Sequence, residues 1–525
     1  MHPSAHIDTF ARDNLPPAEA LPVFRFELPE LQYPATLNAA AELVDRQVEA
    51  GHRERPALIG ADERWTYGEL QAMVNRIANV LVEDAGIQPG NRVLMRFPNS
   101  PLFAACYLAV LKCGAVAVPT MPLLRNAELS VIVERARIDY AICDARLLDE
   151  TAGLAFTKLY TSEDIRNLAS AASDSYDAVP TASDDVALIA FTSGTTGKPK
   201  GCIHYHRDIM AMCDTFSRNV LKPGPDDVFI GSPPLAFTFG LGGLLTFPLH
   251  AGAATILLEA APPPVLADSI AKLGATICFT APTAYKVLLS DEHVGKVGGL
   301  RTAVSAGEHL PRPVYEDWKQ KTGIRMIDGI GATEIIHIFL SMTGENDKPG
   351  STGTPVPGYE VRVVDNHLKD KPDEEPGLLA VRGPTGCKYL DDPRQADYVK
   401  GGWNLTGDVF RRDADGYFWY VARGDDMIIS SGYNISGPEV EEALLAHSSV
   451  SECAVVAHPD EQRGHVPKAF VVLSAGVSGT PELAKELQDF VKSTIAPYKY
   501  PRAVEFIEQL PKTQTGKIQR FALRQ

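Results

Sequence analysis

The sequence lacks paired cysteines. Its eight cysteines are scattered over 525 residues, and no two of them form a C-x-x-C pair. They are too few for a disulfide framework and wrongly spaced for a zinc site, so we expect a reducing, cytoplasmic location. The N-terminal residues also lack the apolar segment of a secretory signal, which favours the same compartment.

An excess of positive charge and a long apolar run are missing as well. The formal net charge is −16, which argues against nucleic acid as a partner because binding to phosphates requires a basic face. The most apolar stretch, residues 102–120, is interrupted by Lys112 and Gly114 and closed by Pro119. It therefore predicts a core helix that leads into a strand, and no membrane span is expected.

What the sequence does contain is a dense group of hydrogen-bond donors directly after a predicted buried strand, residues 186–191. The segment from Phe191 to Gly201 reads FTSGTTGKPKG. Loop N–H groups, hydroxyls and ammonium groups together suit a polyphosphate, and glycine lets the backbone approach a ligand closely. These groups come from Thr192, Ser193, Gly194, Thr195, Thr196, Gly197, Lys198 and Lys200. A surface loop is the alternative, but such loops rarely combine all three kinds of donor.

The P-loop of nucleoside triphosphatases does not fit this segment. Its pattern, G-x-x-x-x-G-K-[ST], requires glycine where Thr192 stands and Ser or Thr where Pro199 follows Lys198. Proline is also unsuited to the helix that must follow a P-loop. The segment closely resembles the signature of the adenylate-forming superfamily, which includes acyl-CoA synthetases, peptide-synthetase adenylation domains and luciferases. In that family it holds the phosphates of ATP.

Helical and strand patterns alternate over most of the chain. Layered α/β subdomains are therefore expected, with residues 150–184 as a weakly structured connection. The predicted helices are 37–50 and 66–84, and the predicted strands are 92–97, 115–119, 138–143, 228–231, 253–258, 276–280 and 324–328. A small β subdomain is predicted over 350–423, with strands at 359–364 and 377–382. We predict a large ATP- and acid-binding domain, 1–423, and a small α+β domain, 424–525, with helices 438–446 and 481–494 and strands 454–457 and 469–473.

The resemblance covers nearly the whole chain and implies further nucleotide-binding residues. In the family the adenine pocket is lined by two segments that each follow a short strand. They correspond here to Ala306, Gly307 and Glu308, and to Asp328, Gly329 and Ile330. Asp408 matches the ribose clamp, with Arg423 as its partner. Alone, each segment would be an ordinary turn after a strand. It is their order behind the phosphate segment that supports the assignment to a nucleotide site.

The resemblance also implies the metal site and the catalytic set. Gly331-Ala332-Thr333-Glu334 matches the magnesium segment, in which Glu334 would hold Mg²⁺ and Thr333 would touch the α-phosphate. Lys517 matches the catalytic lysine, whose ammonium group would stabilise the negative charge that grows as a carboxylate displaces pyrophosphate. The implied catalytic residues are thus Lys517, Thr192, Lys200 and Glu334.

A mobile C-terminal domain is part of what the resemblance implies. Asp425 occupies the hinge position, and Ser430, Ser431, Gly432 and Tyr433 match the segment that admits coenzyme A after the small domain rotates. Ala422 stands where the family usually has glycine, a departure that leaves the role of Arg423 intact. The resemblance also allows a homodimer.

The segment GATEIIHIFLS resembles that of benzoate-type aryl-CoA ligases, in which His337 and the aromatic residue at Phe239 border a flat pocket. The implied acid-binding residues are Phe237, Thr238, Phe239, Gly331, His337 and Ile338. Aromatic walls favour a ring over a flexible chain. We therefore predict that benzoate or a substituted benzoate, such as 2-aminobenzoate, is activated by ATP as acyl-AMP and passed to coenzyme A. A core histidine bonded to backbone is an equally weighted alternative for His337.

Other activities stay open. A medium-chain fatty acyl-CoA synthetase and a stand-alone adenylation enzyme that loads a carrier protein are the main alternatives; no carrier domain follows the Lys517 segment before Gln525. A luciferase-like oxygenase has no support beyond the shared motifs, and a non-catalytic nucleotide sensor would have no need of Lys517. His204 and His206, two residues apart, could share one face of a strand, but no third metal ligand is evident, and we interpret both as structural.

Overall fold

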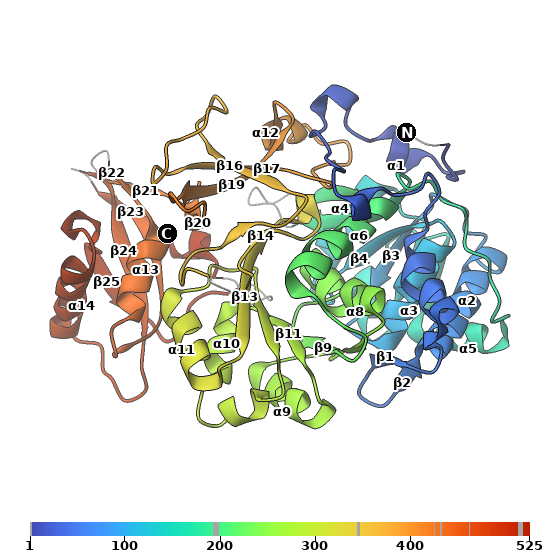
Figure 1. The fold of residues 1–525 in the computed structure, drawn as a ribbon, viewed down its shortest axis with the longest axis horizontal. Coiled ribbons are helices and arrows are strands. Elements are labelled where there is room, and N and C mark those ends of the chain that lie inside the picture. Colours follow the sequence, from blue (N-terminus) through green and yellow to red (C-terminus); the bar gives the residue numbers. More distant parts are fainter. Residues whose placement is uncertain are drawn as a thin grey trace.

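The computed structural model describes residues 3–192, 199–343, 347–424, 426–430, 433–460, 463–512 and 518–524. Figure 1 shows a large α/β region that carries the N-terminus and a smaller C-terminal group of strands and helices at one end of the molecule. The predicted fold class is therefore confirmed. All eight cysteines are buried and free, as expected for a chain without a disulfide framework.

A six-stranded sheet contains the strand that precedes the phosphate segment. Its strand order is β6-β5-β3-β4-β7-β8, and all neighbours run parallel except the antiparallel pair β7 and β8. The strands are β3 (Arg92–Arg96), β4 (Val116–Thr120), β5 (Tyr140–Cys143), β6 (Lys158–Thr161), β7 (Val186–Thr192) and β8 (Lys200–Tyr205). The phosphate segment thus joins two antiparallel strands, and the helix that a P-loop requires is replaced by β8.

A nine-stranded sheet lies beside it, in the order β15-β14-β13-β12-β11-β9-β10-β1-β2. The strands from β13 to β1 run parallel, whereas β14, β15 and β2 are antiparallel at the two edges. Their bounds are β1 (Pro56–Ile59), β2 (Arg64–Thr66), β9 (Val228–Gly231), β10 (Ala254–Ile256), β11 (Ile277–Thr280), β12 (Thr302–Ser305), β13 (Arg325–Gly331), β14 (Ile338–Ser341) and β15 (Thr354–Pro355).

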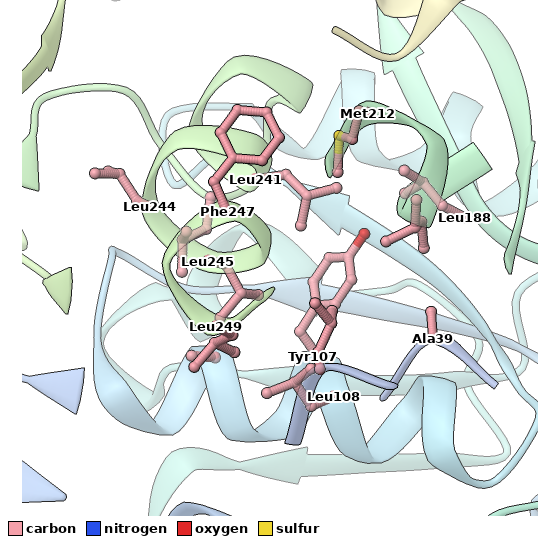
Figure 2. Packing of buried hydrophobic residues seen from close by; sticks show 14 of the residues in the cluster. Ala39, Tyr107, Leu108, Leu188, Met212, Leu241, Leu244, Leu245, Phe247 and Leu249 are labelled. Atoms are coloured by element: carbon pink, nitrogen blue, oxygen red, sulfur yellow. The ribbon is translucent and has the colours of Figure 1, made fainter. Parts of the chain in front are cut away.

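The main core joins the helices to both sheets. Figure 2 shows Tyr107 and Leu108 packed with Leu188, Met212 and the apolar residues from Leu241 to Leu249. These come from α3 (Pro101–Lys112), β7, α6 (His206–Met212) and the helical run of α7 (Thr238–Leu241), residues 242–246 and α8 (Phe247–Ala251). Every residue of α3 is buried, so the most apolar stretch of the sequence is a core helix. In the part of the chain that the structure describes, no helix is long and apolar enough to span a membrane.

The expectation for residues 150–184 is wrong. They include β6 and α5 (Ser162–Ala171), and β6 pairs with β5 at the edge of the six-stranded sheet. Thr161 and Asp164 form a capping box at the start of α5, whose Ile165 and Ala169 are buried. A threonine followed three residues later by a carboxylate is the signal that could have predicted this helix.

Further helices cover the sheets, and the remaining strands form two smaller sheets. The helices are α1 (Phe10–Asp13), α2 (Tyr67–Glu83), α4 (Asn126–Ala136), α9 (Pro263–Leu273), α10 (Pro282–Leu288), α11 (Arg312–Thr322) and α12 (Gln395–Tyr398). The β subdomain contains β16 (Glu360–Val364), β17 (Gly377–Arg382), β18 (Val399–Lys400), β19 (Trp403–Arg412) and β20 (Phe418–Arg423). The C-terminal region contains β21 (Ile428–Ser430), β22 (Tyr433–Ile435), α13 (Gly437–Leu445), β23 (Val450–Asp460), β24 (Gly464–Leu473), α14 (Pro481–Thr494) and β25 (Ala503–Phe506).

Two buried tyrosines give a matched test of the core. The Tyr285 hydroxyl on α10 donates to the carbonyl oxygens of Cys278 and Val304 at 2.8 and 3.0 Å, whereas the Tyr107 hydroxyl is buried and has no hydrogen-bond partner among the residues that the structure describes. Tyr285→Phe should cost about 1–2 kcal/mol because it removes a donor from two buried acceptors, and Tyr107→Phe should cost nothing. The thermal unfolding midpoints of the two variants check this. Equal midpoints, or a lower one for Tyr107→Phe, would contradict the assignment of these hydrogen bonds.

Candidate active site

Several of the predicted site residues lie near one another: Lys200 contacts Glu334, and the carboxylates of Glu334 and Asp408 interact electrostatically. Thr192 and Lys200 are register partners at the open end of the β7–β8 pair. The turn from Gly331 to His337 joins β13 to β14. Asp408 and Arg423 are register partners on β19 and β20. Segments that are far apart in sequence therefore contribute to one region.

At the centre of this region, Lys200 and Tyr389 share one oxygen of Glu334. The Lys200 ammonium lies 3.4 Å from Glu334 Oε1 and 2.7 Å from the Tyr389 hydroxyl. That hydroxyl donates to the same Oε1 at 2.5 Å. The Lys200 and Glu334 side chains are only 20% and 11% exposed, so this pair is screened much less than a surface salt bridge. Burial and the Glu334 carboxylate both raise the pKa of Tyr389, which keeps the phenol protonated as the donor.

Tyr389 and its neighbour Tyr398 were not predicted from the sequence. Their rings meet edge to face at a centroid distance of 5.9 Å, and the Lys200 ammonium lies 4.7 Å from the Tyr389 ring centroid and 6.0 Å from that of Tyr398. The Tyr398 hydroxyl is buried and has no hydrogen-bond partner within the described part of the chain. Since Tyr389 lies 189 residues beyond Lys200, only the folded chain reveals the contact.

The turn that carries Glu334 has a strained backbone. Ile336 has a φ of +70° and a ψ of −38°, a conformation that β-branched residues rarely adopt. Strain of this kind costs about 1–3 kcal/mol and persists only where surrounding contacts enforce it. Gly331 tolerates the close approach of the returning chain, because a Cβ there would lie 2.7 Å from the carbonyl oxygen of His337. The turn is therefore held in one particular shape.

The segments expected to line an adenine pocket lie at the ends of neighbouring strands. Ala306 and Gly307 follow β12, and Gly307 has a φ of +91°, which favours glycine. Asp328, Gly329 and Ile330 lie within β13, so the expectation that they follow a strand is wrong, because β13 continues as an antiparallel partner of β14. Among the described residues, Asp328 Oδ1 is buried without a hydrogen-bond partner, and burial raises the pKa of this carboxyl, an increase that hydrogen bonds from Ser305 and the Gly329 N–H partly offset.

The residues expected to clamp a ribose form an ion pair in which only the carboxylate is buried. Arg423 Nη1 lies 3.2 Å from Asp408 Oδ1, and the Asp408 side chain is 9% exposed whereas that of Arg423 is 44% exposed. Burial raises the pKa of Asp408, and the Arg423 guanidinium offsets part of this increase. Thr192, the register partner of Lys200, has a buried hydroxyl oxygen without a hydrogen-bond partner among the described residues.

His337 lies inside a cluster of aromatic rings, which we call the aromatic cluster: Phe216, Phe239, Phe247, Phe279 and His337. The His337 ring is 4.6 Å from that of Phe247, 5.5 Å from Phe216 and 5.9 Å from Phe239, between centroids. The side chain is buried, and neither ring nitrogen has a hydrogen-bond partner in the described parts of the chain. Burial lowers the pKa of His337 to about 3. The Phe239 backbone offsets part of this decrease, so the alternative of a backbone-bonded core histidine stays open.

Of the other predicted acid-binding residues, Phe239 joins this cluster directly. Thr238 is the first residue of α7 and Phe237 is its N-cap, so both directly precede Phe239 in the chain. Ile338 is the register partner of Gly331 at the β13–β14 edge. Phe216, Phe247 and Gly242 were not predicted from the sequence. A Cβ on Gly242 would lie 2.4 Å from His337 Cδ2 and 2.5 Å from Nε2, and the glycine pair at 242–243 in an apolar helical run was the available signal.

His204 and His206 are both buried, but they do not share a strand face. His204 lies in β8 and His206 begins α6. His204 Nε2 lies 2.8 Å from the Thr333 carbonyl oxygen, and the Ala39 N–H donates to His206 Nδ1 at 3.1 Å. No group of three or more His, Cys, Asp or Glu side chains suited to a metal occurs among the described residues.

Several predicted residues lie outside the described residues: Ser193, Gly194, Thr195, Thr196, Gly197, Lys198, Asp425, Ser431, Gly432 and Lys517. Of the segment expected to admit coenzyme A, Ser430 ends β21, and its register partner Tyr433 begins β22. The predicted roles of all these residues stay predictions.

Comparison with known families identifies the chain. A model of the AMP-binding enzyme family matches residues 44–388, and one of the AMP-binding enzyme C-terminal domain matches residues 439–517. The chain belongs to the AMP-binding enzyme family. The predicted resemblance to adenylate-forming enzymes is thereby confirmed.

Similar members of the AMP-binding family cover almost the whole chain. A benzoate–CoA ligase of Thauera aromatica is 35% identical over 513 residues, which is 94% of this chain and 97% of the relative. The mitochondrial acyl-coenzyme A synthetase ACSM3 of Mus musculus is 34% identical, with 95% and 91% covered. Among solved structures, the anthranilate CoA ligase AuaEII in complex with anthranoyl-AMP is 32% identical, with 94% and 98% covered and a TM-score of 0.90.

Gly242 gives a test of the aromatic cluster. Gly242→Ala should displace the His337 ring, because the new methyl group would overlap it, and overpacking of a core typically costs about 1–3 kcal/mol. We expect the KM for an aromatic acid to rise by about tenfold or more, with ATP affinity unchanged. Steady-state kinetics and calorimetric titration of ATP measure the two effects. Gly224→Ala is the control, since a Cβ there would meet no atom within 4 Å; an unchanged KM in Gly242→Ala would refute the role of the cluster.

Proposed function

We propose that this member of the AMP-binding family is an AMP-forming acid–CoA ligase that acts on benzoate or a small substituted benzoate. The acid would be activated by ATP as an acyl-adenylate with release of pyrophosphate, and the acyl group would then pass to coenzyme A. The relatives named for benzoate and anthranilate support an aromatic substrate.

One observation carries the choice of substrate. The turn from Glu334 to His337 joins the Lys200–Glu334–Tyr389 cluster to the aromatic cluster, so polar and apolar groups meet within three residues. Flat rings prefer offset or edge contacts with aromatic side chains. A substituted ring would place its apolar faces against Phe239 and Phe247, while a ring nitrogen of His337 would meet a polar substituent. An amino or hydroxyl group fits this role, because an unpaired polar group in an apolar site is costly.

The chemistry needs positive charge near the reacting groups. The carboxylate oxygen of the acid attacks the α-phosphorus of ATP, the bond to the bridging oxygen breaks, and pyrophosphate leaves. Lys200, Lys517 and the N–H groups of the phosphate segment would stabilise the charge that develops on these oxygens. Thr192 and Thr333 would donate hydrogen bonds to phosphate oxygens, and Asp408, held by Arg423, would accept from the ribose hydroxyls.

The residues present fit a magnesium ion. In the described structure, both contacts of the Glu334 carboxylate fall on Oε1, which leaves Oε2 for a hard cation. Mg²⁺ typically takes one or two carboxylates and completes its shell with water and phosphate oxygens, so a single glutamate is enough. When bound, the ion would neutralise phosphate charge.

The second half-reaction would use a different domain orientation. After pyrophosphate leaves, the C-terminal domain, which we place at 424–525 with its hinge at Asp425, would rotate and bring Ser430, Ser431, Gly432 and Tyr433 to the acyl group. The thiol of coenzyme A would then attack the acyl carbonyl and AMP would leave. A cytoplasmic location and a homodimer stay predictions of this proposal.

A medium-chain fatty acid is the second candidate, because ACSM3 and its relatives are acyl-coenzyme A synthetases of similar identity. A panel of benzoate, 2-aminobenzoate, 3-hydroxybenzoate and hexanoate, assayed for AMP release with and without coenzyme A, distinguishes the candidates. We expect an aromatic acid to give the highest kcat/KM and the release to depend on coenzyme A. Hexanoate as the best substrate would contradict the aromatic proposal, and adenylate formation without consumption of coenzyme A would favour a carrier-loading enzyme.

Lys517 provides a separate test of the two half-reactions. Lys517→Ala should reduce acyl-adenylate formation by roughly 10²–10³-fold, the effect of removing one preorganised charge-stabilising group. It should spare thioester formation from preformed acyl-adenylate, since the lysine would act only in the first step. Rapid-quench measurement of each half-reaction checks this, with Lys512→Ala as the control in the same segment. An equal loss of both half-reactions in Lys517→Ala would refute its role.

A further inference from the structure

A chain of buried polar contacts runs from the β subdomain side of the molecule to the turn that carries Thr333 and Glu334. The Lys388 ammonium lies 2.9 Å from Asp208 Oδ2, and these side chains are 0% and 1% exposed. The same Oδ2 lies 3.8 Å from His204 Nδ1, and the His204 side chain is 0% exposed. His204 Nε2 is 2.8 Å from the Thr333 carbonyl oxygen. Because a carbonyl oxygen only accepts, His204 donates this hydrogen bond from Nε2.

The alternation of β8 explains why His204 reaches this turn. Side chains at positions i and i+4 of a strand project from the same face. Lys200 and His204 therefore face the turn together: Lys200 contacts the Glu334 carboxylate, and His204 contacts the backbone of the preceding residue, Thr333. In the segment beside β8, Lys388 contacts Asp208, whereas the next residue, Tyr389, donates to Glu334.

A second backbone carbonyl of the turn is held in the same way. The Thr385 hydroxyl donates to the Ile335 carbonyl oxygen at 2.8 Å, and it is itself bonded to the Tyr359 hydroxyl at 2.8 Å. His204 and Thr385, from two different segments, thus donate hydrogen bonds to the carbonyl oxygens of residues 333 and 335. Directly after them comes Ile336, with its strained φ of +70°. Contacts of this kind are what a strained conformation needs in order to persist.

We propose that His204, through its hydrogen bond to the Thr333 carbonyl oxygen, is a positioning residue that fixes the Thr333–Glu334 backbone for the binding of ATP. The inference rests on the proposed function, in which Thr333 and Glu334 meet the phosphates and their cation. His204 itself touches no substrate; it acts through the Thr333 carbonyl. Loss of its hydrogen bond would leave the Ile336 N–H as the remaining donor to the Thr333 carbonyl oxygen, at 3.1 Å, and would loosen the turn.

Matched variants separate positioning from simple support of the fold. His204→Leu removes the donor, and His204→Gln keeps an amide N–H that reaches the position of Nε2. His206→Leu is the control, because His206 is equally buried but bonds to Ala39, away from the turn. The readouts are the dissociation constant for ATP with Mg²⁺, from calorimetry without any acid, and the thermal unfolding midpoint.

We expect His204→Leu to weaken ATP binding by about tenfold or more, because the loss of one hydrogen bond to a buried group typically has an effect of this size. His204→Gln should restore it to within about threefold of the wild type, and His206→Leu should lower the unfolding midpoint while ATP affinity is unchanged. Wild-type affinity in His204→Leu, or equal weakening in His204→Leu and His206→Leu, would overturn the proposal.

A second pair of variants covers the case in which His204→Leu does not fold. Thr385→Val removes the donor to Ile335, and Thr385→Ser keeps it; ATP should bind more weakly to the first and nearly normally to the second. Equal affinities in this pair would count against positioning of the turn. Because ATP binding is measured without acid, a wild-type protein that binds ATP but activates no acid would refute the proposed substrate class and still allow this comparison.

Discussion

One oxygen of Glu334 accepts from the Tyr389 hydroxyl and lies within reach of the Lys200 ammonium, and these three side chains come from separate parts of the fold. Lys200 begins the edge strand of the six-stranded sheet, Glu334 lies in the turn at the edge of the nine-stranded sheet, and Tyr389 precedes α12. A buried ion pair of this kind contributes little net stability, since desolvation offsets the attraction, but removal of one partner is costly. Its effect is to bring two sheet edges into one fixed arrangement.

The surroundings of this contact divide the site into a polar part and an apolar part. On the polar side lie Thr192, Asp328 and Tyr398, whose buried oxygens have no partner in the described structure. On the apolar side, His337 is enclosed by phenylalanine rings. Natural proteins seldom leave buried polar groups unsatisfied. A bound nucleotide and a flat acid would together supply hydrogen-bond partners for these groups on the two sides of the strained turn.

Much of this arrangement was predictable from local pattern. The apolar run before the phosphate segment, the helical spacing of α2 and the buried strands β3, β4 and β9 match the predicted elements closely, because burial on one face leaves a clear period in the sequence. The segment DGIG was wrongly expected to follow its strand, since continuation of a strand through two glycines has no such signal. Tyr389 and Phe247 were missed altogether. Tyr389, for example, contacts residues that lie 55 and 189 positions away in the sequence. No local pattern encodes contacts over such separations.

The most direct measurement of the central claim is isotope exchange between labelled pyrophosphate and ATP by the purified wild-type chain, with benzoates offered one at a time and coenzyme A left out. If the Lys200–Glu334–Tyr389 cluster and the phosphate segment together form an acyl-adenylation site, label will enter ATP only when a suitable acid is present. Protein that binds ATP with Mg²⁺ yet exchanges no label with any carboxylic acid would contradict the account.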